Sequence, residues 1–288
     1  MMKNLKSQLQ SYKRSPISLI LRILVIAAAV ITAFILGAII IYILVKGIPN
    51  LSLDLFAWEY NSENVSMMPA IINTILMVLL TLVIAAPIGI FSAIYLVEYA
   101  KRGNKLVTLV RMTAETLAGI PSIVYGLFGY LMFVVSLRWG YSFMAGALTL
   151  AIMVLPTIMR TTEEALKAVP DAYRDGSFGL GAGRLRTVFQ VVLPSAIPGI
   201  LSGVILSIGR IVGETAALIF TAGTIAAIPA SVMNSGRTLA IHMYALLNEG
   251  LYMNQAYATA VILLVMVIII NACSGLVAKL FARKTGEK

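Results

Sequence analysis

The chain has 288 residues, of which 60% are hydrophobic and only 12% charged, and its mean hydropathy is +0.94. A soluble domain usually carries about 25% charged residues, so this composition excludes an ordinary soluble protein and predicts a chain that crosses a membrane several times. The net charge of +10 does not indicate nucleic-acid binding, because the basic residues lie in short stretches beside apolar runs. With one cysteine (Cys273) and one histidine (His242, expected alone in an outer loop), we expect no internal disulfide and no metal site.

The first apolar run, Leu19–Val45, is longer than the core of a signal peptide, which spans about 7 to 15 residues. We therefore expect a retained transmembrane helix. In this interpretation residues 1–18 form a cytoplasmic tail, and residues 19–69 comprise the first helix and an outer loop.

Five further apolar runs follow and are read as membrane spans. They are Ala70–Val97, Ile120–Leu137, Phe143–Met159, Ile197–Phe220 and Ala258–Phe281. The sequence thus predicts an all-α, polytopic membrane protein with six transmembrane helices.

A break is expected at "AGIPS", Ala118–Ser122, where the third run begins, because proline and glycine interrupt helices. A loosened helix exposes backbone groups that can line a cavity. Ser122 and Tyr125, beside this break, are therefore candidates for a substrate pathway. An ordinary kink is the alternative interpretation.

Orientation follows from the lysines and arginines. Most of them lie in the N-terminal tail, in the connections between the second and third runs and between the fourth and fifth runs, and at the C-terminal end. Basic residues are enriched on the cytoplasmic side of membrane proteins. Both termini and these two connections are therefore predicted to be cytoplasmic.

The connection between the fourth and fifth runs, Thr161–Ile200, is predicted to form a helix, a turn and a second helix. Thr162 is a candidate N-cap, with Glu163 and Glu164 in the first turn. The glycine-rich "DGSFGLGAG" predicts a tight turn, and "RLRTVFQVVLP" predicts a short amphipathic helix. These glycines do not form a nucleotide-binding fingerprint, since no strand precedes them.

The fifth run contains two charges, Arg210 and Glu214, in the stretch "SIGRIVGETAALIF". A charged group inside a membrane helix costs about 2.5 kcal/mol or more. On a continuous helix Ser207, Arg210 and Glu214 lie on one polar stripe, which should face protein or water. One interpretation is a salt bridge, either between Arg210 and Glu214 or shared with a companion chain. The other is that Arg210 offers its donors to an oxyanion, with Glu214 holding the guanidinium in place.

The spacing in the cytoplasmic connection resembles the EAA loop of ABC importer permeases, E-A-A-x3-G-x9-I-x-L-P. The matching residues are Asp175, Gly176, Ser177, Gly181, Val191, Leu193 and Pro194. Asp replaces Glu, Gly and Ser replace the two alanines, and Val replaces Ile. The stretches "LAGIPSIVYGLFGYL" and "GRIVGETAALIF" are similar to phosphate-transport permeases of the PstA type, and this similarity covers residues 70–285.

The resemblance implies a type I importer permease of the cytoplasmic membrane that forms half of a phosphate pathway. Its expected partners are a companion permease subunit in a heterodimer, a cytoplasmic ATPase dimer on the loop 161–199, and an external phosphate-binding protein. The chain itself is expected to bind no cofactor and to have no ATPase site, because ATP and Mg²⁺ belong to the partner ATPase. Besides the EAA-type residues, Arg184 and Arg186 are candidates for the ATPase contact or for binding to lipid headgroups.

Two alternatives remain open at this point. The chain could be a permease for another oxyanion, such as molybdate or sulfate. It could also be a transporter driven by an ion gradient, although no clear inverted repeat is seen. An intramembrane enzyme is not favoured, since the deep charges are Arg210 and Glu214 and no catalytic dyad accompanies them.

Overall fold

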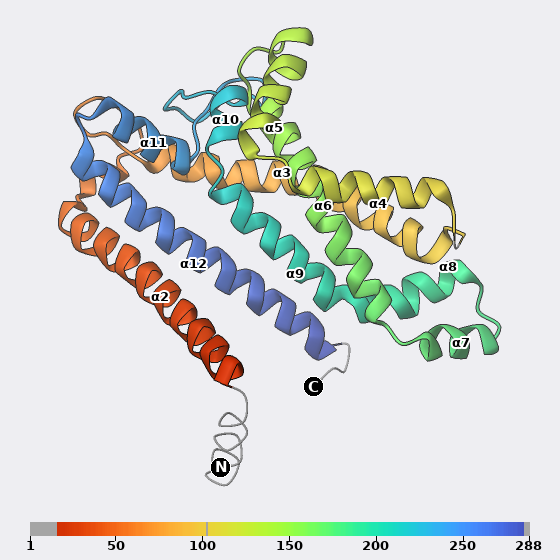
Figure 1. Ribbon diagram of the computed structural model, residues 1–288. Helices are drawn as coiled ribbons and strands as arrows, with labels where there is room; N and C mark the ends of the chain where they lie inside the picture. The colour runs from red at the N-terminus through yellow and green to blue at the C-terminus, as the bar shows by residue number, and fades with distance from the viewer. Residues whose placement is uncertain (1–15, 102, 285–288) are drawn as a thin grey trace.

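The computed structural model describes residues 16–101 and 103–284, and all regular structure in these residues is helical (Figure 1). Most of the predicted tail, residues 1–15, lies outside the described residues. The helices are α2 (Pro16–Gly47), α3 (Met68–Ile94), α4 (Lys105–Ala118), α5 (Ser122–Gly129), α6 (Phe143–Ala168), α7 (Asp171–Gly179), α8 (Arg184–Thr187), α9 (Leu193–Val212), α10 (Ala216–Thr221), α11 (Leu239–Glu249) and α12 (Met253–Lys284). Five helical stretches are long and apolar enough to span a membrane, or six if a bent pair counts as one, which confirms the predicted all-α fold.

The centre of the molecule is formed by α3, α6 and α9, which pack on one another at glycines. A Cβ atom on Gly89 of α3 would overlap Ile158 of α6, and one on Gly203 of α9 would overlap Thr161. Small residues let two backbones approach closely, a common way to join helices in a membrane. Gly199 and Gly203 of α9 therefore allow its backbone to lie close against α6.

Helix α2 lies at the edge of the bundle and runs along α12 (Figure 1). Nearly all of its side chains are exposed, and they are almost entirely apolar. An exposed apolar surface of this length suits contact with lipid. The first turn of α2 and the last turn of α12 lie at the same end of the bundle, as expected if both termini are on one side.

The predicted break in the third run is confirmed. Helices α4 and α5 are separated by three residues and meet at an angle of 105°. The Tyr125 hydroxyl donates a hydrogen bond to the carbonyl of Leu117 at 2.7 Å, so it joins the first turns of α5 to the last turn of α4. The bend at Pro121 is thus held by a side chain across it.

Two helix boundaries differ from the prediction. Thr162 is not an N-cap, because α6 continues through it to Ala168 and buries it together with Glu163. The fifth run is not one helix: α9 ends at Val212, and α10 begins at Ala216. The first helix of the cytoplasmic connection is α7, and the second is continuous with α9 from Arg184 to Val212.

The long outer segment between α10 and α11 is fastened to α3. The amide of Asn73 donates to the carbonyls of Ala227 and Arg237 at 2.9 and 3.1 Å. The Thr74 hydroxyl accepts a hydrogen bond from the Leu239 backbone at 2.8 Å. Two adjacent side chains of one membrane helix therefore fix the start of α11.

His242 is buried in α11 and is not the loop residue expected from the sequence. Its ring lies edge-on to Tyr60, and the same tyrosine ring faces the buried guanidinium of Arg237 at 4.6 Å. Burial, with the Arg237 charge as a smaller cause, lowers the pKa of His242 to about 3. His242 is therefore a neutral core residue at physiological pH.

Candidate functional site

The helix break after α9 places the two charges of the fifth run in different environments. Gly213 ends α9, and the next residue, Glu214, is 8% exposed. A Glu214 carboxylate oxygen accepts a hydrogen bond from the Ala217 backbone at 3.1 Å and so caps α10. Glu214 is held by the helix that follows the break, not by the helix that carries Arg210.

Glu214 neither pairs with Arg210 nor holds its guanidinium in place, so this part of both alternatives from the sequence is wrong. Residues four apart face each other on a helix, but the break removes this geometry between positions 210 and 214. Within residues 16–101 and 103–284, the Arg210 guanidinium has no ion-pair or hydrogen-bond partner. Its donors are available to a ligand.

Arg210 borders a cavity of about 620 Å³ between α6, α9 and α12, hereafter the Arg210 cavity. The other lining residues are Thr157, Ser202, Ile205, Leu206, Gly209 and Asn271. A guanidinium, a carboxamide and two hydroxyls in an otherwise apolar cavity can orient a small polar anion. Asn271, an amide inside the last apolar run, was not predicted from the sequence, and neither were the hydroxyl residues Thr157 and Ser202.

The remaining predicted pathway residues do not join the Arg210 cavity. Ser207 is buried, and its hydroxyl donates to the Gly203 carbonyl at 2.9 Å. Tyr125 is buried at the α4–α5 bend, and Ser122 is half-buried in the first turn of α5. Of the predicted pathway residues, Arg210 therefore borders the cavity, whereas Ser207 and Tyr125 make hydrogen bonds within or between the surrounding helices.

The hairpin in the connection that the sequence predicts to be cytoplasmic comprises α7, a turn and α8 (residues 171–187, hereafter the cytoplasmic hairpin). The turn is shorter than predicted, because Asp175, Gly176 and Ser177 belong to α7, and it contains Gly181 with a φ of +83°. A positive φ favours glycine at this position. No residue of α7 is buried, so the helix presents its outer surface freely within the described chain.

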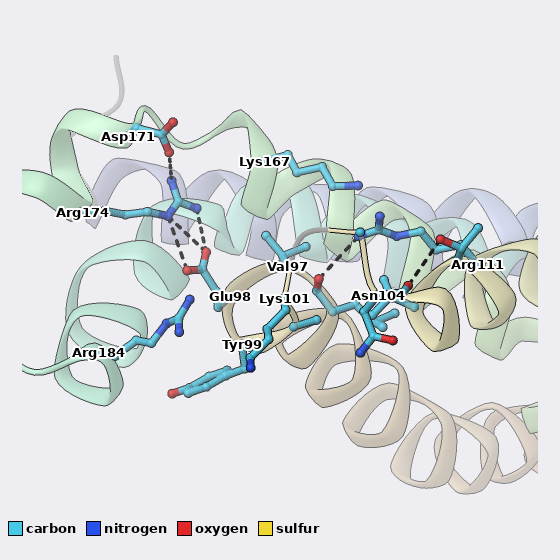
Figure 2. A pocket seen from close by; sticks show the side chains of 15 residues that line it. Val97, Glu98, Tyr99, Lys101, Asn104, Arg111, Lys167, Asp171, Arg174 and Arg184 are labelled. Carbon is cyan, nitrogen blue, oxygen red and sulfur yellow. Dashed lines mark hydrogen bonds and ion pairs between the residues drawn. The ribbon is translucent and has the colours of Figure 1, made fainter.

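Arg174 fastens the cytoplasmic hairpin to the end of α3 (Figure 2). Its guanidinium forms an ion pair with Glu98, which lies in the π-helical turn Tyr95–Tyr99 that extends α3, at 2.7 Å. The same guanidinium donates to the carbonyls of Leu166 and Val169 at 2.9 and 2.8 Å. Both charged side chains are largely buried, which makes this contact much stiffer than a surface pair.

A second arginine of the hairpin approaches the same turn. The Arg184 guanidinium lies over the Tyr99 ring, 5.4 Å from its centre, and Figure 2 shows the two side chains close together. Arg186 instead donates to Gln190 one turn further along, at 2.9 Å. Both arginines are exposed and both interact within the chain: Arg184 contacts the turn that extends α3, whereas Arg186 contacts only its own helical stretch among the interactions described.

The other predicted hairpin residues lie as follows. The Ser177 hydroxyl meets the Thr187 hydroxyl at 2.8 Å and joins α7 to α8. Asp175, Gly176 and Gly181 are exposed, and Leu193 and Pro194 are half-buried where α9 begins. The residues of the spacing motif thus lie in one hairpin and at the base of the helix that follows it.

Several residues around the hairpin were not singled out from the sequence. Glu98 and Tyr99 contact two arginines of the hairpin. Tyr173, Phe178 and Leu180 expose apolar surface on the hairpin itself. An acid at the end of an apolar run and exposed aromatics in a cytoplasmic loop were the available signals. A cavity of about 650 Å³ opens between the hairpin and the α3–α4 connection, lined by Glu98, Lys101, Arg111, Lys167 and Arg184, among others (Figure 2).

Residues 85–287 match the family described as "binding-protein-dependent transport system inner membrane component". A probable ABC transporter permease protein, YqgI of Bacillus subtilis, is 33% identical over 85% of this chain and 89% of its own length. The phosphate transport system permease protein PstA of Pasteurella multocida is 42% identical over 62% of this chain, and the match spans just under two thirds of that relative, 64%. A subunit of a bacterial alginate ABC transporter has a similar fold, with a TM-score of 0.67, 16% identity and coverage of 95% and 97% of the two chains.

Proposed function

Because the chain belongs to the family of binding-protein-dependent transport system inner membrane components, we propose that it carries inorganic phosphate as one permease subunit of an ATP-driven importer. Membership of this family makes it a multi-pass permease of the cytoplasmic membrane. The phosphate substrate is supported by the named relative and by the chemistry of the Arg210 cavity. The chain supplies a pathway and no hydrolytic chemistry of its own.

The observation that carries the proposal is the unpaired guanidinium of Arg210 beside a cavity. Arg210 is half-buried at the end of a helix long and apolar enough to span a membrane, where a charge without a partner is costly. A guanidinium that no acid neutralises within the described chain therefore favours an anion. Its planar fork of donors matches two oxygens of a tetrahedral oxyanion. Phosphate would bind where Arg210, Asn271 and Ser202 border the cavity.

Asn271 and Glu214 give the site its selectivity in this proposal. A carboxamide both donates and accepts hydrogen bonds, so Asn271 can accept a hydrogen bond from the P–OH group that hydrogen phosphate carries and a fully ionised sulfate lacks. Glu214 acts indirectly, since it caps α10 and so fixes the break beside Arg210. The break ends α9 within one turn of Arg210, which keeps the guanidinium at the cavity.

The cytoplasmic hairpin is proposed as the contact for a partner ATPase dimer. Its exposed residues Asp175, Gly176, Gly181 and Arg186, together with Tyr173 and Leu180, offer a surface with polar and apolar parts. The attachment of Arg174 to Glu98 would pass a movement of this surface to α3. ATP and Mg²⁺ would bind to that partner and not to this chain.

A companion permease subunit would complete the pathway, because the Arg210 cavity opens on the outside of this single chain. In the proposed assembly the two permease subunits form a heterodimer. An external phosphate-binding protein docks at the outer segment 221–238. Both termini of this chain lie in the cytoplasm. Lipid would cover α2, whose apolar side chains are exposed.

The test is transport by the assembled complex in vesicles. We expect uptake of radiolabelled phosphate to require ATP, the ATPase partner and the binding protein, and to be unaffected when ion gradients are collapsed. Competition by unlabelled phosphate but not by molybdate or sulfate supports the substrate. Uptake driven by an ion gradient without ATP, or preferred uptake of molybdate, would contradict the proposal.

A further inference from the structure

A second cavity leads from the Arg210 cavity towards the cytoplasmic hairpin. This middle cavity, of about 380 Å³ between α4 and α6, shares Thr157 and Leu206 with the Arg210 cavity. It shares Arg111 and Lys167 with the cavity beneath the hairpin. Three cavities therefore adjoin in series along one side of α6.

The wall of this series is a polar face of α6. Thr157, Thr161, Glu164 and Lys167 follow one another at steps of four, three and three residues, so they lie on one side of the helix, and all four line the middle cavity. Ten residues of helix from Thr157 to Lys167 correspond to about 15 Å. The polar face thus extends from the Arg210 cavity to the cytoplasmic end of α6.

Glu163 holds two cations at this end with the same carboxylate oxygen. Its Oε2 atom lies 2.9 Å from Arg111 Nε and 2.8 Å from Lys167 Nζ. The Glu163 side chain is 7% exposed, whereas the side chains of Arg111 and Lys167 are 40% and 52% exposed and border the cavities. The charges that line the middle cavity balance, because Glu115 and Glu164 border it as well as Arg160. Arg111 and Lys167 also border the cavity beneath the hairpin, where lysines and arginines outnumber the lining acids Glu98 and Asp171, so the surplus positive charge lies at that end of the series.

We propose that Arg111, Lys167 and Glu163 form a release site for the transported oxyanion between the Arg210 cavity and the cytoplasm. The inference rests on the proposed phosphate function and adds a second anion-binding position to it. A guanidinium and an ammonium group suit phosphate oxygens. The Glu163 carboxylate competes for both cations and so keeps binding weak, as a position on a conducting path requires.

The test compares equilibrium binding of radiolabelled phosphate to assembled complexes in phosphatidylcholine vesicles, without ATP and without binding protein. Glu163→Gln keeps the shape and removes the competing charge, so we expect the dissociation constant to fall about tenfold or more. Lys167→Gln removes one positive charge from the cavity wall and should raise the dissociation constant. The control is Glu249→Gln, because the Glu249 side chain is exposed at the end of α11 and borders none of the three cavities, so we expect less than about a twofold change.

Unchanged phosphate affinity in Glu163→Gln and Lys167→Gln overturns the proposal. If Glu163→Gln does not assemble, Lys167→Gln decides alone, because its side chain is half-exposed and its loss leaves the Arg111–Glu163 pair in place. If the variants differ from the unmodified complex in phosphate affinity only in vesicles that contain anionic lipid, a lipid headgroup is the ligand of these residues, and the release site is overturned. Glu163-dependent phosphate binding in a complex without ATP-driven uptake would instead contradict the proposed function and leave the site supported.

Discussion

Arg174 and Glu98 join the cytoplasmic hairpin to the end of a membrane-spanning helix through an ion pair of 2.7 Å. Because the Arg174 guanidinium also bonds the carbonyls of Leu166 and Val169, the same side chain connects α7, α3 and the end of α6. A displacement of the hairpin must therefore move both helices or break a largely buried pair. The other end of α3 fastens the outer segment through Asn73. Helix α3 thus connects the two surfaces at which partners are proposed to bind.

The first prediction concerns this attachment. Glu98→Gln removes the charge that holds Arg174, and loss of one partner of a buried pair costs about 3 kcal/mol. We expect phosphate uptake to fall roughly tenfold or more, while ATP hydrolysis by the assembled complex continues, since the exposed face of α7 is unaltered. Phosphate uptake and ATP hydrolysis are measured on the same vesicles, and a lower ratio of phosphate transported to ATP hydrolysed confirms the prediction.

Asp171→Asn is the matched control for this prediction. Asp171 also contacts the Arg174 guanidinium, at 3.2 Å, but its side chain is 84% exposed, so solvent screens the pair. Transport and its ratio to hydrolysis should stay close to those of the unmodified complex. Equal losses of phosphate uptake in Asp171→Asn and Glu98→Gln would show that transport depends on the charge of the region and not on the buried ion pair.

The second prediction concerns the Arg210 cavity. Arg210→Ala and Arg210→Lys should both abolish phosphate uptake while the complex still assembles, because neither side chain reproduces the planar fork of donors. Asn271→Asp should also lower uptake by about tenfold or more, since it places a negative charge in the same cavity as the anion. Uptake assays and co-purification of the partners measure the two effects separately, and normal uptake in Arg210→Ala would remove the proposed site.

The cavity illustrates what the sequence could predict. Arg210 was identified from its charge inside an apolar run, and this signal does not depend on tertiary structure. The alternative in which it pairs with Glu214 depended on a spacing of four residues, which brings two side chains together only while the helix continues. Gly213 and the cap formed by Glu214 end that helix, and helical periodicity alone does not reveal such a break. Asn271 joins the cavity from a helix 61 residues further along the chain, and no local pattern connects it to Arg210.

The cytoplasmic hairpin shows the same limit. The spacing motif and Gly181 located the turn, but two acids after Thr162 suggested a helix start where α6 continues. Local capping preferences are worth about 1 kcal/mol, whereas burial of Leu166 in the cluster that contains Ile94 and Val192 favours a longer helix by more. The Glu98–Arg174 pair joins residues 76 positions apart, so only the packed structure reveals it.

The third prediction tests the close contact between α6 and α9. Gly203→Ala should lower the thermal unfolding temperature of the complex in detergent, because the added Cβ would overlap Thr161 in a packed interface. We expect the free energy of unfolding to fall by about 1 to 3 kcal/mol.

Gly209→Ala is the control on the same helix. A Cβ at Gly209 meets nothing within 4 Å, and alanine favours a helix over glycine by about 1 kcal/mol. The unfolding temperature should therefore stay the same or rise. A decrease of the same size in both variants would contradict a specific contact at Gly203.

The last prediction concerns pH and the outer segment. Burial lowers the pKa of His242 to about 3 from an ordinary value of 6.5, so between these values the unfolded chain binds a proton that the folded chain excludes. The stability contributed by neutral His242 is complete above about pH 6.5 and is lost progressively as the pH falls towards 3, by on the order of 5 kcal/mol in total. We expect limited proteolysis of residues 221–250 to increase as the pH is lowered from 7 to 4. His242→Gln should make proteolysis much less dependent on pH, because glutamine does not titrate. An unchanged pH dependence in His242→Gln would assign the acid sensitivity to another group.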